Sequence, residues 1–208
     1  MAERCVAFPP VIGGQPRLLI LGSMPGAASL RLGQYYGHPR NGFWPIMMRL
    51  LGAPADLDYA ARLAVLIANG IALWDVLAEC ERRGSLDAGI HPASIRVNEI
   101  GRLLGAHPGI RLIAFNGATA EREFRRRVWP ELDPTMQAIA TRRLPSTSPA
   151  HAGMTLAEKR TAWQAALTTR RPDNQPLIGE SSRESGIAQV PRRPTPDAVD
   201  SRLPGRRR

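Results

Sequence analysis

RLLILGSMPG, residues 17–26, is the stretch that decides the fold class. Its apolar run ends at a glycine loop, a pattern typical of a strand buried on both faces of a parallel sheet. Residues 110–117 (IRLIAFNG) and 138–146 (AIATRRLPS) have related patterns, and residues 71–76 (IALWDV) indicate a further strand or strand end. These segments predict a short, mainly parallel central sheet.

Helical patterns alternate with these strands. Apolar residues recur at helical spacing, and the predicted helices cover residues 41–51, 59–69, 95–104, 118–129 and 155–168. Alternating strands and helices predict an α/β fold of three layers, α/β/α. Ligands of such sheets bind beyond the carboxyl ends of the strands. We therefore expect the loops at Gly22, Asn116 and Pro145 to converge on one site.

The 208 residues predict one folded domain over residues 1–169 and a tail over residues 170–208. The tail has nine arginines, five acidic residues, many prolines and no aromatic residue, so we expect it to be disordered. Of the net charge of +10, the tail carries +4 and the rest of the chain +6. A basic surface of this extent favours a polyanionic partner, with nucleic acid first.

Several protein classes are disfavoured. The sequence has no apolar run near the length of a membrane span and no secretory signal pattern, so we expect a cytoplasmic, nucleoid-associated protein without membrane contacts. Cys5 and Cys80 are far apart in sequence and form no metal-binding motif, so we expect no metal. Neither a phosphate-binding loop nor a dinucleotide fingerprint is present, and we expect no cofactor.

Two loops carry polar and aromatic residues suited to nucleotide chemistry. The first continues from Gly22 into residues 34–44, QYYGHPRNGFW, where glycines allow close approach, tyrosines can stack on a flat ring and Asn41 opens a helix. The second, residues 144–152, reads LPSTSPAHA. Its hydroxyl groups can donate hydrogen bonds to phosphate oxygens.

GSMPG, YYGHPRNGFW, FNG and PSTSP, in this order, resemble the motifs of the uracil-DNA glycosylase superfamily. The chain looks most like its hypoxanthine-DNA glycosylase (deoxyinosine glycosylase) branch, and next most like the mismatch-specific uracil glycosylase branch, over about residues 18–167. The resemblance implies an enzyme that hydrolyses the N-glycosidic bond of a deaminated base flipped out of DNA. Because the chain has a single lysine, we expect the enzyme to be monofunctional and to leave the DNA strand intact. Hypoxanthine is the expected base, with uracil and xanthine as others, and the enzyme is expected to be a monomer.

The resemblance also implies roles for individual residues. Asn41 is expected to position the attacking water, Tyr36 to stack on the base and Asn116 to read its edge. The remaining base-binding residues are Gly22, Ser23 and Met24. The residues expected to contact DNA are Ser146, Thr147, Ser148 and His151.

Two positions depart from better-known members. Met24 stands where the mismatch-specific uracil branch has its asparagine, which argues against ordinary uracil chemistry. Leu144 stands where many uracil enzymes have a histidine that stabilises the departing base, so activation of that base must come from elsewhere.

Simpler roles are open for each of these residues. Asn41 could cap the following helix, Tyr36 could belong to the core, and Asn116 could be a turn residue. His151 could be structural. Asp75, at a strand end, is interpreted as a capping or loop-bracing residue.

Three other functions remain open at this stage. They are a mismatch-specific uracil/thymine-DNA glycosylase, a non-catalytic protein that binds single-stranded nucleic acid by stacking and charge, and a hydrolase acting on a small nucleotide. Lys159 is the only lysine in the chain. We expect it to be exposed and protonated, and therefore a poor nucleophile for a Schiff base.

Overall fold

The computed structural model describes residues 2–167. The predicted tail lies outside these residues. A four-stranded parallel sheet of order β3-β2-β6-β7 forms the centre of the fold. Its strands are β2 (Leu18–Gly22), β3 (Ile71–Asp75), β6 (Leu112–Asn116) and β7 (Ala140–Leu144). Every residue of β2, β3 and β6 is buried, as the continuous apolar runs predict.

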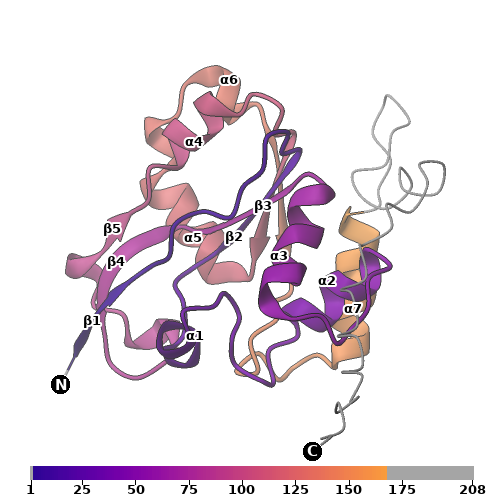
Figure 1. Cartoon of the computed structure of the whole chain (residues 1–208). Coiled ribbons are helices and arrows are strands. Elements are labelled where there is room, and N and C mark those ends of the chain that lie inside the picture. Colours follow the sequence, from indigo (N-terminus) through magenta and orange to yellow (C-terminus); the bar gives the residue numbers. More distant parts are fainter. Residues whose placement is uncertain (1, 168–208) are drawn as a thin grey trace, which may run out of the picture.

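Helices cover both faces of this sheet (Figure 1). One side holds α2 (Phe43–Leu50), α3 (Tyr59–Ala68) and α7 (Leu156–Leu167). The other side holds α4 (Ile100–Ala106), α5 (Ala118–Arg127) and α6 (Pro134–Gln137). The predicted three-layer α/β/α class is confirmed.

A second sheet was not predicted. It is antiparallel, with the order β1-β4-β5, and consists of β1 (Glu3–Val6), β4 (Leu77–Arg82) and β5 (Arg96–Val97). The helix predicted over residues 95–104 is therefore wrong in its first half, because residues 96–97 pair with β4 and the helix begins at residue 100. Cys5 and Cys80 lie opposite each other in the β1–β4 register as free thiols.

The other unpredicted elements are short. They are helix α1 (Ala27–Leu32), which is separated from the end of β2 by four residues, helix α6, and 3-10 turns at Asp87–Gly89, Pro92–Ser94 and Trp129–Glu131. Helix α1 places the loop after β2 beside the carboxyl ends of the other strands (Figure 1).

Lys159 is buried, contrary to the prediction of an exposed amine. Only 6% of the residue is accessible, and its Nζ donates hydrogen bonds to the carbonyl oxygens of Ser148 and His151, at 3.3 and 2.7 Å. The Lys159 side chain thus extends from α7 to the backbone of the loop that follows β7. Helical periodicity could not reveal this, because the acceptors are backbone atoms of another segment.

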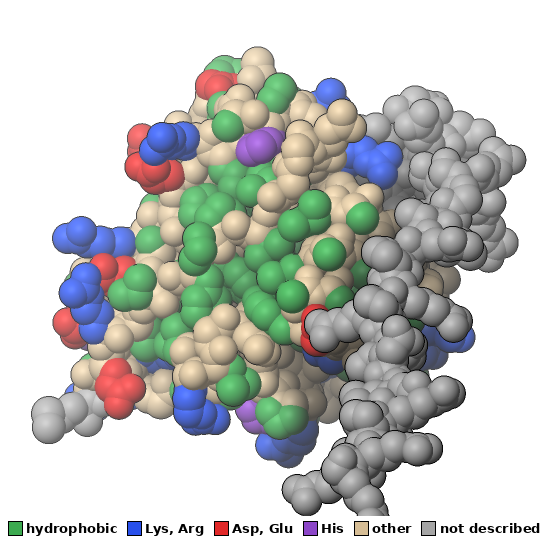
Figure 2. Space-filling view, in the orientation of Figure 1, with side chains coloured by type: hydrophobic (Ala, Val, Ile, Leu, Met, Phe, Trp, Pro, Cys, Tyr) green, Lys and Arg blue, Asp and Glu red, His purple; other side chains and the backbone are tan. Residues whose placement is uncertain are grey.

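The outer surface is mixed in character. In the view of Figure 2, apolar side chains occupy the middle of the face and charged ones lie around its edge. Basic side chains and a histidine lie along the lower edge, the end at which α1 lies in Figure 1. Within residues 2–167, no helix has the length and apolarity to cross a membrane, and no cluster of three His, Cys, Asp or Glu residues is placed to hold a metal ion.

Candidate functional site

The loops after three parallel strands converge on one cavity of about 710 Å³. This volume lies within the range of small-molecule sites. Its wall comprises residues 22–29, parts of the 35–41 loop, Asp75, the 85–87 turn, residues 116–119 and residues 146–151. The expected convergence at Gly22, Asn116 and Pro145 is thus found at the carboxyl edge of the sheet.

Asn41 lies at the junction of this cavity and a smaller neighbouring one. Its Oδ1 accepts a hydrogen bond from the backbone N–H of Phe43 at 3.0 Å, while Gly42 is the N-cap residue of α2. The side chain therefore forms a turn leading into the helix rather than a true N-cap. Its Nδ2 has no hydrogen-bond partner among the described residues, so one end of the amide is anchored and the other is available at the cavity wall.

Tyr36 forms part of the wall of the same cavity. Its ring stacks on Phe43, with centroids 4.0 Å apart and planes 26° apart. Its φ of +54° lies in the left-handed region, which is a genuine outlier for an aromatic residue and costs on the order of 1–3 kcal/mol. Such strain is concentrated at functional sites. Tyr35 also lines the cavity, but it is buried and its hydroxyl donates to backbone carbonyls. Of the two tyrosines, Tyr36 is therefore the one whose ring forms a parallel stack at the cavity wall.

Asn116 and Thr147 hold β6 and the loop after β7 together. Nδ2 of Asn116 donates to Oγ1 of Thr147, and the backbone N–H of Thr147 donates to Oδ1 of Asn116, both at 2.9 Å. The carbonyl of Thr147 then accepts the N–H of Gly42, also at 2.9 Å. Thr147 is only 1% exposed, so its hydroxyl serves Asn116 rather than facing solvent.

Gly22 allows the closest approach in the site. A Cβ at Gly22 would lie 2.3 Å from Oδ1 of Asp75 and 3.2 Å from the hydroxyl of Tyr36. Only glycine leaves room for these two oxygens. The carboxyl of Asp75 and the hydroxyl of Tyr36 therefore border the same small volume beside the end of β2.

Asp75 is the residue that sequence reasoning underrated. It is 3% exposed and lines the cavity, and its Oδ2 has no hydrogen-bond partner within residues 2–167. Burial and the nearby Asp87 carboxylate raise its pKa to about 8, although the positive charge of Arg82 acts in the opposite direction. The signal available in the sequence was its place at the end of an apolar strand. That Asp75 pairs in register with Gly22 became clear only in the structure.

The remaining predicted base-binding residues hold the first loop. The hydroxyl of Ser23 donates to Asp87 at 2.7 Å, which ties the loop to the 3-10 turn after β4. Met24 is buried and contributes to the cavity wall.

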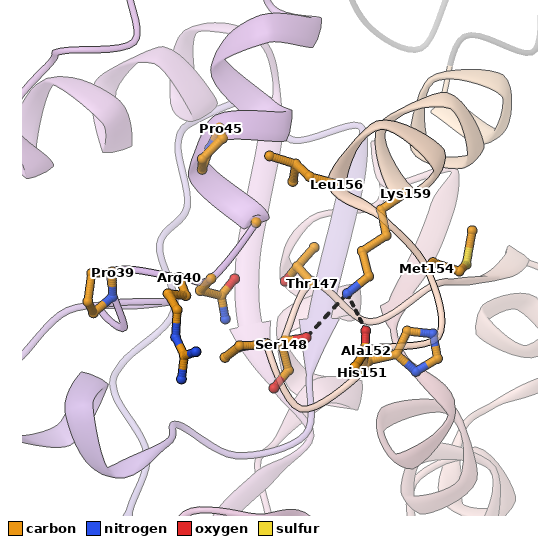
Figure 3. Close-up of a pocket in the computed structure, with 13 residues that line it drawn as sticks. Pro39, Arg40, Pro45, Thr147, Ser148, His151, Ala152, Met154, Leu156 and Lys159 are labelled. Carbon is orange, nitrogen blue, oxygen red and sulfur yellow. Dashed lines mark hydrogen bonds between the residues drawn. The ribbon is translucent and has the colours of Figure 1, made fainter.

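A second cavity of about 300 Å³ lies beside the first (Figure 3). Arg40, Ser148, His151 and Lys159 are among its lining residues. The hydroxyl oxygens of Ser146 and Ser148 accept backbone N–H groups within their own loop, at 3.2 Å each, while His151 is exposed. Ser146 and Ser148 are half-buried, and all three residues line the larger cavity.

Comparison with known proteins supplies the context for this geometry. The profile of the uracil DNA glycosylase superfamily matches residues 9–168. Two proteins named hypoxanthine DNA glycosylase, from Methanosarcina barkeri and Methanosarcina acetivorans, are each 35% identical over 163 residues, which cover 77% of this chain and 96% of theirs. The solution NMR structure of a Methanosarcina acetivorans protein described as a uracil DNA glycosylase has a TM-score of 0.64 at 32% identity, covering 78% of this chain and 98% of that one.

Proposed function

Because the chain belongs to the uracil DNA glycosylase superfamily and is a DNA glycosylase, we propose that its substrate is DNA that contains hypoxanthine, and that it leaves an intact abasic site. The cavity at the strand ends, with Asn41 on its wall, is the observation that carries this proposal. The names of the two Methanosarcina relatives support the choice of base.

Hydrolysis of an N-glycosidic bond requires three things at one place. Positive charge develops on the sugar as the bond breaks, so the enzyme must stabilise that charge, orient a water molecule and bind the departing base. We assign the orientation of the water to Asn41. Its anchored Oδ1 keeps the amide in one position, and a neutral amide can hold a water without removing its proton in the ground state.

The base is proposed to occupy the larger cavity. One face of the Tyr36 ring rests on Phe43, so the ring is supported as a stacking surface. Asn116 is proposed to read the base with the amide hydrogen and lone pair left over from its bonds to Thr147. A nucleotide must leave the duplex to reach this depth, which is the usual strategy of enzymes that act on bases.

The DNA backbone is proposed to run past the smaller cavity. Arg40 and His151 are polar groups at its wall, and Ser146 and Ser148 can turn their hydroxyl hydrogens outward. Thr147 is left out of this set because it is buried. Its proposed role is to hold Asn116 and the Asn41 loop in place.

The test is base release from matched duplexes that carry hypoxanthine, xanthine, uracil or thymine opposite each of the four normal bases. Under single-turnover conditions we expect hypoxanthine to be released fastest. Faster release of uracil or thymine would instead support a mismatch-specific uracil/thymine glycosylase, the alternative favoured by the description of the structural neighbour. Binding to every duplex without release of any base would contradict the proposal.

A further inference from the structure

We propose that Asp75 is the general acid of this glycosylase: its protonated carboxyl donates a proton to the base as the bond to the sugar breaks. The proposal rests on the glycosylase function but not on the choice of hypoxanthine. Leu144 has no polar group that could stabilise the departing base, and Asp75 would supply that group instead. Leu144 is itself buried, so its side chain faces the core.

Asp75 lies where a side chain would contact a base bound in the larger cavity. It is the last residue of β3, in register with Gly22 at the end of β2, and thus part of the floor that the strand ends form. Its side chain is nearly inaccessible but lines the larger cavity. Asn41, which is half-buried on the wall, would lie nearer the sugar, and Asp75 nearer the far edge of the base.

The bonding state of Asp75 differs from that of a structural carboxylate. A buried acid that braces a loop accepts hydrogen bonds with its oxygens, because a buried polar group without a partner costs about 1–3 kcal/mol. Among the described residues, Oδ2 of Asp75 has no hydrogen-bond partner. An unpartnered buried oxygen on a residue that lines a cavity indicates that its partner is a ligand.

The surroundings also favour a neutral acid that can become charged. Arg82 is buried nearby, but its Nη2 and Nε donate to the carbonyls of Pro25 and Gly84, and no ion pair joins it to Asp75 among the described residues. An ion pair would keep the carboxyl ionised. A cation held at a distance instead stabilises the carboxylate that forms when the proton leaves.

Cleavage of the glycosidic bond is accompanied by transfer of the Asp75 proton. The C1′–N bond breaks, and its electron pair passes to the base while the Asp75 proton moves to the base. The water held by Asn41 then adds its oxygen to C1′ and releases one proton to solvent, and the Asp75 carboxylate takes up one proton from solvent. The products are a neutral base, an abasic sugar and the regenerated acid.

The other charged groups around Asp75 determine how its pH dependence is assigned. Asp87 raises its pKa and Arg82 lowers it. Tyr35 and Tyr36 also face it and are held neutral, because burial raises their pKa values far above the usual range. His38, Arg40 and His151 line the same cavity, so the histidines require a control.

The experiment measures single-turnover release of whichever deaminated base the wild-type enzyme releases fastest, at saturating enzyme, from pH 6 to pH 10. The wild-type rate should be level at low pH and fall about tenfold per unit above a pH near 8, because the acid must be protonated. Asp75→Asn keeps the shape and a hydrogen-bond donor but has no proton to transfer. Its rate should be about 100-fold lower at pH 7 and level across the same range.

Three results would overturn the proposal. They are a wild-type rate that stays level up to pH 9.5, a fall at high pH that persists in Asp75→Asn, and an Asp75→Asn rate at pH 7 equal to that of the wild type. The wild-type profile alone decides the matter should the variant fail to fold. The fall in rate above a pH near 8 must also persist in the His38→Gln, His151→Gln double variant, because its loss there would assign the fall to a histidine. If hypoxanthine is not released but another base is, the choice of base fails while this test stands.

Discussion

Asn116 and Thr147 hold each other by two hydrogen bonds of 2.9 Å, one from each residue. The pair joins the end of β6 to the loop after β7, and the carbonyl of Thr147 extends the link to Gly42, next to Asn41. Asn116 and the loop that carries Asn41 thus both depend on one buried threonine.

Thr147→Val should therefore lower the free energy of unfolding by about 1–3 kcal/mol, because Asn116 Nδ2 would lose its acceptor in a buried place. Thr147→Ser keeps the hydroxyl and is the matched control, with a loss below that of valine. Urea denaturation of the three proteins measures this. Equal stability of the valine variant and the wild type would show that the hydroxyl contributes nothing.

Asn116→Ala should change the order in which different deaminated bases are released, because its amide is proposed to read the base edge. The residue also braces Thr147, and the two roles can be separated. In a Thr147→Val background the bond from Nδ2 is already gone and only the bond from the Thr147 N–H to Oδ1 is left to lose. Loss of that bond should slow release of every base alike, so a change in the order of bases caused by Asn116→Ala comes from reading. A uniform loss on every base in that background would leave only the bracing role.

Asn41→Ala should reduce single-turnover base release about 10²–10³-fold and change DNA affinity only a few-fold, as expected for a contact made in the chemical step. The variant also loses the bond to the N–H of Phe43. Asn41→Ser is the control, since its hydroxyl can accept from that N–H but is too short to reach the same water. Near-normal release by either variant would contradict the assignment.

Tyr36 offers a comparison between its ring and its hydroxyl. Tyr36→Ala should weaken binding of a flipped-base analogue by about 1–3 kcal/mol, the usual value of a base–aromatic stack. Tyr36→Phe keeps the stack on Phe43 and removes only the hydroxyl, so it should bind the analogue with little loss. Unchanged binding by the alanine variant would remove Tyr36 from the base site.

The sequence predicted the parallel sheet because β2, β3 and β6 are apolar runs that end at Gly22, Asp75 and Asn116, and because β7 follows a related but less apolar pattern. It did not predict the antiparallel sheet, since β1 and β4 carry charged residues and β4 follows β3 after a single residue. Such strands are stabilised by pairing with distant residues, and the local sequence pattern contains little information about that pairing.

Some site residues could be predicted from the sequence, and Asp75 could not. Asn41 and Tyr36 were found from a loop rich in glycine and aromatic residues, and the structure places both at the cavity. Asp75 looked like an ordinary strand end, because its significance depends on burial and on the lack of a partner for Oδ2. Both are properties of three-dimensional packing.

Lys159 is the lysine that could allow this enzyme to cut the DNA strand. Glycosylases that also cut the backbone attack the sugar with an amine and form a Schiff base. Lys159 is the only lysine of the chain, and it lines the smaller cavity (Figure 3), whose wall also includes Asn41. Burial lowers its pKa, which by itself would favour the nucleophilic form. Its Nζ, however, donates to two backbone carbonyls, and this arrangement holds the nitrogen away from a sugar in the larger cavity and favours the ammonium form.

We therefore expect Lys159 to brace the Ser148–His151 turn and the product to be an intact abasic site. Borohydride added during the reaction should trap no covalent adduct between protein and DNA, and the strand should break only after alkali or heat. Lys159→Met, which retains the apolar stem but loses the donors, should lower the melting temperature by several degrees through the unpaired carbonyls. An adduct that forms with the wild type and disappears in Lys159→Met would show instead that the amine reaches the sugar.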